Sequence, residues 1–322
     1  MFSSLPSNQS YRPLVSTLLA IDYSLGHGLQ PFWFHLSIFA LFVALALLLA
    51  FVVHRLLDRA ASSARNRWIA LAAAALYGLH PANADTINYI IASSDLISTL
   101  GVIASFAVYL AFPHLRRYYL YALPAAIVIL AKPPAAIFAV LFAIYRSLFP
   151  PRDARLTRLR NATAWQAETR LQRFAEIFTP FVICGAMLLF VQYMTPHSWI
   201  AGAANSHNYL ITQPYVALLY FKTFFWPSGL SAGYDLNPFT TTNDPRFWAG
   251  FVFIALFMMC AIAASVFKKT RVIGFGLLWF LIALLSTSAL PLAEPMNDHR
   301  TFLPYVGLVM RWQVPRHCSS PA

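Results

Sequence analysis

The chain has 322 residues, of which 59% are hydrophobic and 11% are charged, and its formal net charge is +12. Soluble domains carry roughly 25% charged residues, so the composition excludes an ordinary soluble protein and predicts a polytopic membrane protein. The positive charges lie between apolar stretches, which favours a role in orienting the chain in a bilayer over binding nucleic acid. Its three cysteines are scattered and form neither a disulfide framework nor a zinc motif.

The apolar runs predict an all-α integral membrane protein with about eight or nine transmembrane helices and an additional interfacial helix. We divide the chain into an extracytoplasmic segment with a juxtamembrane helix (1–31), a transmembrane core (32–310) and an irregular tail (311–322). A last helix is expected to begin near Pro304. The other predicted helices cover 32–53, 68–84, 86–112, 119–131, 135–149, 177–195, 247–267 and 273–291.

Basic residues predict how the spans are oriented. Most Lys and Arg residues fall in connections that can share one side of the membrane, and the positive-inside rule makes that side cytoplasmic and the N-terminus extracytoplasmic. We expect a multi-pass protein of a bacterial inner membrane. The residues concerned are Arg55, Arg59, Arg65, Arg67, Arg116, Arg117, Arg146, Arg152, Arg155, Arg158, Arg160, Arg170, Arg173, Lys268, Lys269 and Arg271.

The stretch "ILAKPPAAIF" at 129–138 interrupts one apolar run with a Lys and two Pro. If residues 118–149 crossed the membrane once, the most basic loop, 150–173, would be extracytoplasmic, against the charge rule. The chain is therefore predicted to turn back at Lys132, because the residue before Pro disfavours helix. A lone ammonium in hydrocarbon is costly, so we expect Lys132 at the outer end of this hairpin, in a wet cavity.

The same argument, from the number of membrane crossings and the charge of the loops, applies to residues 208–226, "NYLITQPYVALLYFKTFFW". If this segment spanned the membrane, the basic group "KKTR" at 268–271 would face outside. We therefore interpret the segment as interfacial or re-entrant. Tyr215, Tyr220 and Trp226 are predicted to be anchors at the level of the lipid headgroups.

The topology gathers acids, bases and histidines from separate loops on the outer face. Asp85, Asn88 and Asp95 lie at i, i+3 and i+10, which predicts one stripe of a helix that faces the bundle, with Asp95 two to three turns deep. Asp95 then needs a partner, so a structural hydrogen bond is as good an interpretation as catalysis. His80, which precedes Pro81, is interpreted either as a ligand or as the end of a helix.

Two further stretches supply candidates. In "AEPMNDHRTFLP" at 293–304, Asp298 suits a helix cap, whereas Arg300 suits a planar clamp on a phosphate. In "SAGYDLNPF", Tyr234 and Asp235 are either a loop turn or ligands. The chain lacks HExxH, GxSxG and P-loop motifs and a Cys cluster, so the common catalytic signals of soluble enzymes are missing.

Taken in order, five motifs resemble one family. They are "YRPL" at 11–14, "HP" at 80–81 followed by Asp85, "KPP" at 132–134, "WPSGLSAGYD" at 226–235 and "NDHRTFLP" at 297–304. The chain resembles the membrane region of the GT-C glycosyltransferases, specifically the transmembrane-and-tetratricopeptide-repeat O-mannosyltransferases and their bacterial relatives. The resemblance covers about residues 10–310 and implies a GT-C-like bundle.

The resemblance implies transfer of a sugar, with mannose as the candidate, from a polyprenyl-phosphate donor to a protein or glycan hydroxyl at the extracytoplasmic face. Membrane lipids are expected partners, and nucleic acid is not. No cofactor and no set of metal ligands is assigned, and whether the reaction uses a divalent cation stays open. The phosphate leaving group needs charge neutralisation, for which Lys132, Arg300 and Arg12 are suited. Asp85 and Asp298 are the candidates for the carboxylate that takes the proton of the acceptor hydroxyl. His80, Asp95, Tyr234, Asp235 and His299 complete the predicted substrate-binding set.

The sequence also departs from the family. The family has an additional first helix, followed by a long outer loop that carries its key acid. Ser93 stands where the family usually has Arg. The family also continues into further helices and tetratricopeptide repeats. We therefore expect a fragment that is inactive on its own. Two alternatives stay open: a non-catalytic membrane protein that binds a lipid-linked sugar or a partner, and a lipid-linked sugar transporter, although no internal repeat supports the latter.

Overall fold

The computed structural model describes residues 10–149, 170–199, 202, 205–231 and 233–310. Within these ranges all regular elements are helices, which confirms an all-α polytopic membrane protein. Five helices are long and apolar enough to cross a membrane, and shorter apolar helices accompany them. Residues 311–322 and most of the predicted 150–173 loop lie outside the described residues.

The N-terminal half forms two hairpins around a central helix. α1 (Pro13–Leu25) and α2 (Pro31–Ala60) both begin with Pro, whose fixed φ suits the first turn of a helix. α3 (Asn66–Gly78), α4 (Ala84–Asn88) and α5 (Ser93–Ala111) follow, and then α6 (Leu123–Val128) and α7 (Phe138–Leu148). α5 is the most buried of the spanning helices. Its Phe106 ring packs at 5.3 to 5.6 Å from the rings of Phe138, Tyr145 and Trp279.

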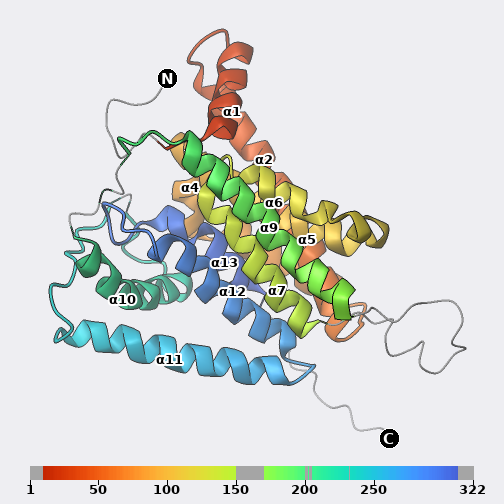
Figure 1. Ribbon diagram of the computed structural model, residues 1–322. Coiled ribbons are helices and arrows are strands. Elements are labelled where there is room, and N and C mark those ends of the chain that lie inside the picture. Colours follow the sequence, from red (N-terminus) through yellow and green to blue (C-terminus); the bar gives the residue numbers. More distant parts are fainter. Residues whose placement is uncertain (1–9, 150–169, 200–201, 203–204, 232, 311–322) are drawn as a thin grey trace, which may run out of the picture.

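The C-terminal half wraps this core. It contains α9 (Arg170–Met194), α10 (Ser206–Phe225), α11 (Pro245–Val266), α12 (Arg271–Ser288) and α13 (Phe302–Val309). α9 and α11 leave most of their apolar surface exposed on the outside of the bundle, as lipid-facing helices do (Figure 1). α12 and α13 approach closely, because a Cβ on Gly276 would come within 2.4 Å of the Gly307 carbonyl oxygen. Small residues allow such close packing between membrane helices.

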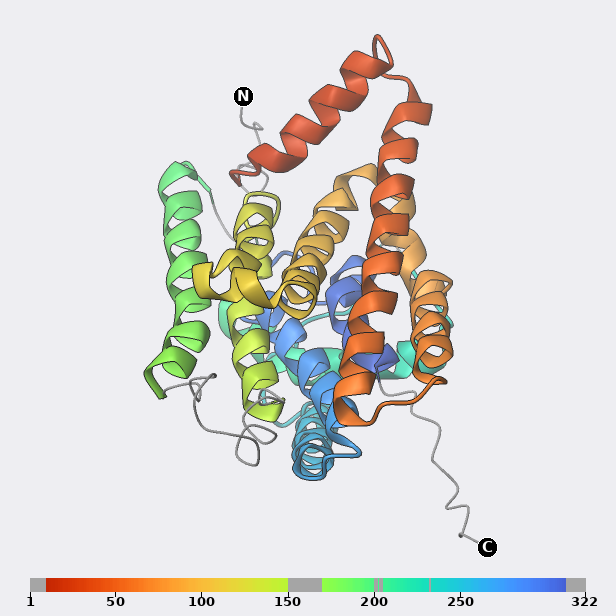
Figure 2. The ribbon, with the colours of Figure 1, turned by 90° about the vertical axis from the view of Figure 1, so that its right-hand side faces the viewer.

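The connections between the long helices divide between two ends of the bundle (Figures 1 and 2). One end carries the α2–α3 and α11–α12 connections, the C-terminal end of α7 and the start of α9, at the lower right of Figure 1. These are the connections in which the sequence places its basic residues. The described basic residues of these connections thus lie at one end, and their assignment to the cytoplasmic side stays a prediction.

The chain turns at Lys132 as the two prolines predict. α6 ends at Val128 and a 3₁₀ helix begins at Pro133, with Lys132 extended between them. α6 has only 6 residues, far shorter than the predicted helix 119–131, because 3₁₀ turns take up residues 113–118 and 120–122.

Two predictions about side-chain placement were wrong. The helix expected at 86–112 is interrupted, since Tyr89 is extended and α5 begins only at Ser93. Asp95 therefore lies in the first turn of α5, and Asn88 is exposed rather than aligned with it. Tyr220 is not a headgroup anchor, because it is buried and its hydroxyl donates to the Asn297 carbonyl oxygen at 2.8 Å. Trp226 remains 69% exposed at the end of α10, as an anchor would be.

Candidate functional site

A cluster of charged side chains forms at the end of the bundle opposite the basic connections. We call it the charged cluster. It is built from four segments that are distant in sequence: the start of α1, the α4–α5 region, the Lys132 turn and the loop before α13. Its members are Arg12, Asp85, Asp95, Lys132, Asp298, His299 and Arg300.

Lys132 and Asp95 form the ion pair at the centre of this cluster. The Lys132 Nζ atom lies 2.5 Å from Asp95 Oδ2, and the two side chains are 13% and 12% exposed. Asp95 occupies the first turn of α5, where the positive end of the helix dipole favours a carboxylate. The bend at Tyr89 and the turn at Lys132 therefore bring the two groups together.

Arg12 and Arg300 add positive charge beside that pair. The Leu14 N–H donates to the Leu130 carbonyl oxygen at 3.4 Å, which holds the start of α1 next to the Lys132 turn. Burial lowers the pKa of Arg12, and the nearby Asp95 carboxylate opposes that shift. Both Arg12 and Arg300 act electrostatically on Lys132. The pair is thus flanked by two further cations.

The guanidinium groups of Arg12 and Arg300 are not fully used by the protein. One Arg300 nitrogen donates to the Glu294 carbonyl oxygen at 2.8 Å, which fixes the side chain within its own loop. The Nε atoms of Arg12 and Arg300 are buried and, within the part of the chain that the structure describes, have no hydrogen-bond partner. A buried donor without a partner is costly, so these atoms are candidates for binding a ligand.

The loop before α13 is held in place by α10. The Tyr220 hydroxyl accepts from the Asn297 N–H at 2.7 Å and donates to the carbonyl oxygen of the same residue. The Asn297 side chain accepts from the His299 N–H at 3.3 Å, which starts the 3₁₀ turn Asp298–Thr301. Asp298 does not cap the turn as predicted, because Asn297 does so and directs Asp298 inward.

Asp298 is bound by the loop after α10. The Tyr234 hydroxyl donates to both carboxylate oxygens, at 2.8 and 2.9 Å, and the Ser231 N–H donates to Oδ2 at 3.2 Å. Burial raises the pKa of Asp298, while the bonds from Tyr234 and Ser231 oppose that shift. With both oxygens engaged, Asp298 is better placed to hold Tyr234 than to accept a proton from a substrate.

Asp85 and His299 face each other on the open side of the cluster. The His299 Nδ1 atom lies 3.8 Å from Asp85 Oδ2, and the side chains are 25% and 21% exposed. Burial lowers the pKa of His299 to about 4, aided by Lys132 and Arg300 and opposed by Asp95. The imidazole is therefore neutral near pH 7, so this contact is not an ion pair there. Burial and the charge of Asp95 raise the pKa of Asp85.

Three predicted site residues are not members of the charged cluster: Tyr234, which bonds Asp298 from its edge, His80 and Asp235. The His80 ring is stacked on Phe224 at 5.0 Å, its Nδ1 atom accepts from the Ala82 N–H, and its Nε2 atom donates to the Phe224 carbonyl oxygen at 3.0 Å. Both ring nitrogens thus serve the fold, in keeping with the helix-end interpretation. Asp235 is exposed and belongs to a neighbouring cavity.

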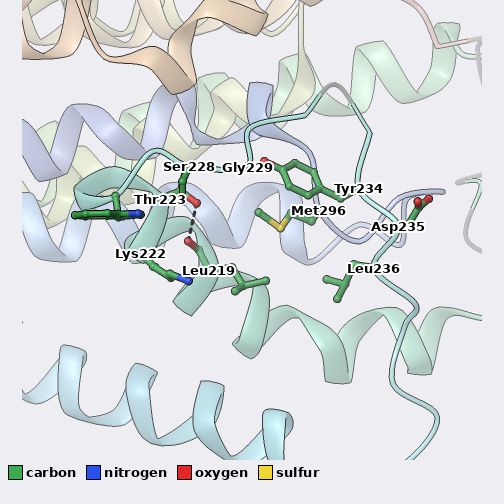
Figure 3. Close-up of a pocket in the computed structure, with 10 residues that line it drawn as sticks. Leu219, Lys222, Thr223, Ser228, Gly229, Tyr234, Asp235, Leu236 and Met296 are labelled. Carbon is green, nitrogen blue, oxygen red and sulfur yellow. Dashed lines mark hydrogen bonds between the residues drawn. The ribbon is translucent and has the colours of Figure 1, made fainter.

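That cavity has a volume of about 320 Å³ and lies between α10 and the loop that follows it. Figure 3 shows Lys222 towards one end of the cavity and Asp235 towards the other. The Thr223 hydroxyl donates to the Leu219 carbonyl oxygen at 3.0 Å, so it is not offered to the cavity. Tyr234 lines the cavity and also bonds Asp298, so it connects the cavity to the charged cluster.

Lys222, Trp226 and Met296 line the cavity but were not among the predicted site residues. A signal existed for Lys222, since it interrupts the apolar stretch "LYFKTFFW" much as Lys132 interrupts its own run. Within the described residues, no group of three or more His, Cys, Asp or Glu side chains could hold a metal ion.

Comparisons with known proteins give one distant relative. Part of the chain is 28% identical over 116 residues to the protein O-mannosyl-transferase Tmtc3 of Drosophila melanogaster. The match covers 32% of this chain and 12% of that protein, so the chain corresponds to a small part of its relative. No family model matches the chain, and no solved structure matches it. The chain is thus a helical membrane protein with a distant likeness to an O-mannosyltransferase.

Proposed function

We propose that the charged cluster binds the phosphate of a polyprenyl-phosphate sugar and that the protein is the core of a membrane glycosyltransferase. The convergence of Arg12, Lys132 and Arg300 from three separate segments is the observation that supports this most strongly. Of the three carboxylates in the cluster, Asp95 pairs with Lys132 and Asp298 is bound by Tyr234 and Ser231, so within the described residues neither guanidinium is paired with a carboxylate. Within the described residues, the buried Nε donors of Arg12 and Arg300 have no hydrogen-bond partner, which adds capacity for an oxyanion.

The position of the cluster suits a lipid-linked donor. Lys132 lies at a turn between short apolar helices, so a phosphate held there would leave its polyprenyl chain beside the bundle. Low exposure around the ion pair excludes much of the bulk water, which strengthens electrostatic interactions with a phosphate. The cations would stabilise the negative charge that develops on the leaving phosphate.

The transfer itself would need few protein groups. The acceptor oxygen attacks the anomeric carbon of the sugar, the bond from that carbon to the phosphate oxygen breaks, and its electron pair leaves with polyprenyl phosphate. The acceptor proton needs a base. Of the three aspartates in the cluster, Asp85 is the best placed, because Asp95 is paired with Lys132 and Asp298 is bound by Tyr234. Its raised pKa also favours proton uptake.

The acceptor would approach through the cavity behind Tyr234. This cavity lies between α10 and the following loop, and Tyr234, which lines it, bonds Asp298 of the charged cluster. Mannose as the sugar, and a protein or glycan as the acceptor, follow only from the resemblance and the distant relative.

The proposal is tested with purified protein in lipid nanodiscs, labelled polyprenyl-phosphate mannose, and a Ser/Thr-rich peptide or an oligosaccharide as acceptor. Binding of the donor and label transfer that is lost in Asp85→Asn supports the transferase. Saturable donor binding with no transfer supports the alternative of a non-catalytic binding protein. Donor movement across a sealed bilayer would instead support a transporter, and absence of donor binding contradicts all three.

A further inference from the structure

A second polar cluster lies at the opposite end of the bundle, where α2, α7 and α9 meet the turn after α5. We call it the arginine–tyrosine cluster; it consists of Arg59, Arg116, Arg146, Tyr109, Tyr121, Tyr145 and Glu176. Arg146 lies 14 residues after Lys132 along the chain, which corresponds to roughly 20 Å of helix. The two clusters are therefore separate sites.

Glu176 and Arg146 form the inner part of the cluster. Arg146 is fully buried and its Nε atom lies 2.8 Å from Glu176 Oε2. The Tyr109 hydroxyl donates to the same carboxylate at 3.2 Å, and the Tyr121 hydroxyl donates to the Glu176 carbonyl oxygen at 2.6 Å. The carboxylate is thus already engaged by an arginine and a tyrosine.

Arg59 and Arg116 form the outer part, and both are only partly buried. The Arg116 guanidinium lies 4.3 Å above the Tyr109 ring and donates from Nε to the Tyr109 carbonyl oxygen at 2.9 Å. The Arg59 guanidinium lies 5.7 Å from the Tyr145 ring and donates to its hydroxyl. The Tyr109 and Tyr145 rings are 5.8 Å apart, so the two arginines stack on adjacent rings.

Within the described residues, this arrangement holds more hydrogen-bond donors than the neighbouring protein groups accept. A guanidinium has about five N–H groups in a planar fork that matches phosphate oxygens. Arg59 and Arg116 each donate one of these N–H groups to a tyrosine. Stacking on aromatic rings fixes the planes of both forks and reduces the entropy lost when they bind an anion. The site is built for an oxyanion with several acceptor atoms.

We propose that Arg59 and Arg116 bind a phosphate-bearing anion, and that its source is the headgroup of an anionic phospholipid. The cluster lies at the ends of α2, α5 and α7, where the apolar spans stop. Phe112 and Leu120, on either side of Arg116 in sequence, are exposed and available to acyl chains. Basic pockets between membrane helices commonly hold such headgroups. The inference does not depend on the proposed glycosyltransferase function.

The test compares two double variants with the same loss of charge. Arg59→Gln with Arg116→Gln removes the proposed ligands. Arg55→Gln with Arg67→Gln is the control, because these arginines are exposed at the same end and stack only on Phe51 and Trp68. Each detergent-purified protein is titrated with phosphatidylglycerol, phosphatidylcholine or inorganic phosphate. Bound lipid is counted by native mass spectrometry and the melting temperature is recorded.

The parent and the control are expected to prefer phosphatidylglycerol to phosphatidylcholine, and the Arg59/Arg116 variant is expected to bind it at least tenfold more weakly. Equal stabilisation of the parent by inorganic phosphate, with the same dependence on Arg59 and Arg116, would confirm the anion site and identify its source as soluble. An equal loss in both double variants would overturn the proposal, because diffuse surface charge would then explain binding. No preference between the two lipids would also overturn it.

A second variant separates binding from folding. If the Gln pair does not fold, Arg59→Lys with Arg116→Lys keeps the charges but loses the planar forks. This pair is expected to fold and to bind phosphatidylglycerol several-fold more weakly than the parent. Undiminished binding by the Lys pair would contradict a fork-specific site.

Discussion

Replacement of Lys132 by Met tests two roles of the Lys132 ammonium group: its ion pair with Asp95 and its proposed contact with the donor phosphate. The Nζ atom is 2.5 Å from the Asp95 carboxylate, and both side chains are mostly buried. Loss of the ammonium removes the proposed contact with the donor phosphate, and it also leaves a carboxylate without its cation. Breaking a buried ion pair costs about 3–5 kcal/mol in stability, and we expect the lower end because the pair keeps some exposure. A charge-assisted contact contributes about 1.5–3 kcal/mol to binding, so affinity should fall roughly ten- to a hundredfold.

A paired variant separates these effects. Lys132→Met with Asp95→Asn removes both charges, so it should recover most of the melting temperature lost in the single variant while donor affinity stays low. Lys132→Arg keeps the charge but changes the shape of the donor group, and a partial loss of affinity is expected. Affinity for polyprenyl-phosphate mannose and the melting temperature are measured for all four proteins. If the Met/Asn variant binds donor as tightly as the parent, Lys132 serves only Asp95 and the reasoning is refuted.

Three further predictions concern pH, topology and packing. The pKa of His299 falls from 6.5 to about 4 on folding. Its contribution to the free energy of unfolding is therefore present above pH 6.5 and is lost as the pH falls towards 4. In the variant His299→Gln, the melting temperature should decline less steeply between pH 6.5 and 4 than it does in the parent. In a background without native cysteines, a Cys at exposed position Asp235 should react with an impermeant maleimide from outside intact cells and one at Lys268 should not; the reverse pattern would invert the topology. Gly276→Leu should abolish folding or lower stability by several kcal/mol, because its Cβ would lie 2.4 Å from the Gly307 carbonyl oxygen, and an unchanged melting temperature would contradict this packing.

The prolines and the distribution of charge in the sequence predicted the turn that positions Lys132. Two prolines and the charge of the neighbouring loops placed a turn at Lys132, and the structure has that turn. The positions of the basic connections predicted which helix ends lie together, and Arg59 and Arg271 do contact the last turn of α7 from α2 and α12. These features depend on local conformation and on composition, which a single sequence contains.

Pairing between distant segments could not be predicted in the same way. Nothing in the local sequence shows that Tyr89 ends a helix, and that bend is what places Asp95 opposite Lys132. Tyr220 resembles an interfacial tyrosine, yet its hydroxyl holds Asn297, 77 residues away in sequence. The polar contacts of His80 were equally hidden, because they depend on the end of α10. Such contacts are set by tertiary packing.

The most direct test of the central claim is a structure determined by electron cryomicroscopy with polyprenyl-phosphate mannose bound in a nanodisc. The account predicts that the donor phosphorus lies in the charged cluster, with its oxygens within hydrogen-bond distance of Lys132 Nζ and of the Nε atoms of Arg12 and Arg300. The sugar should then point towards Asp85. Donor phosphate seated in the cavity beside Lys222, or outside the bundle altogether, would contradict the account.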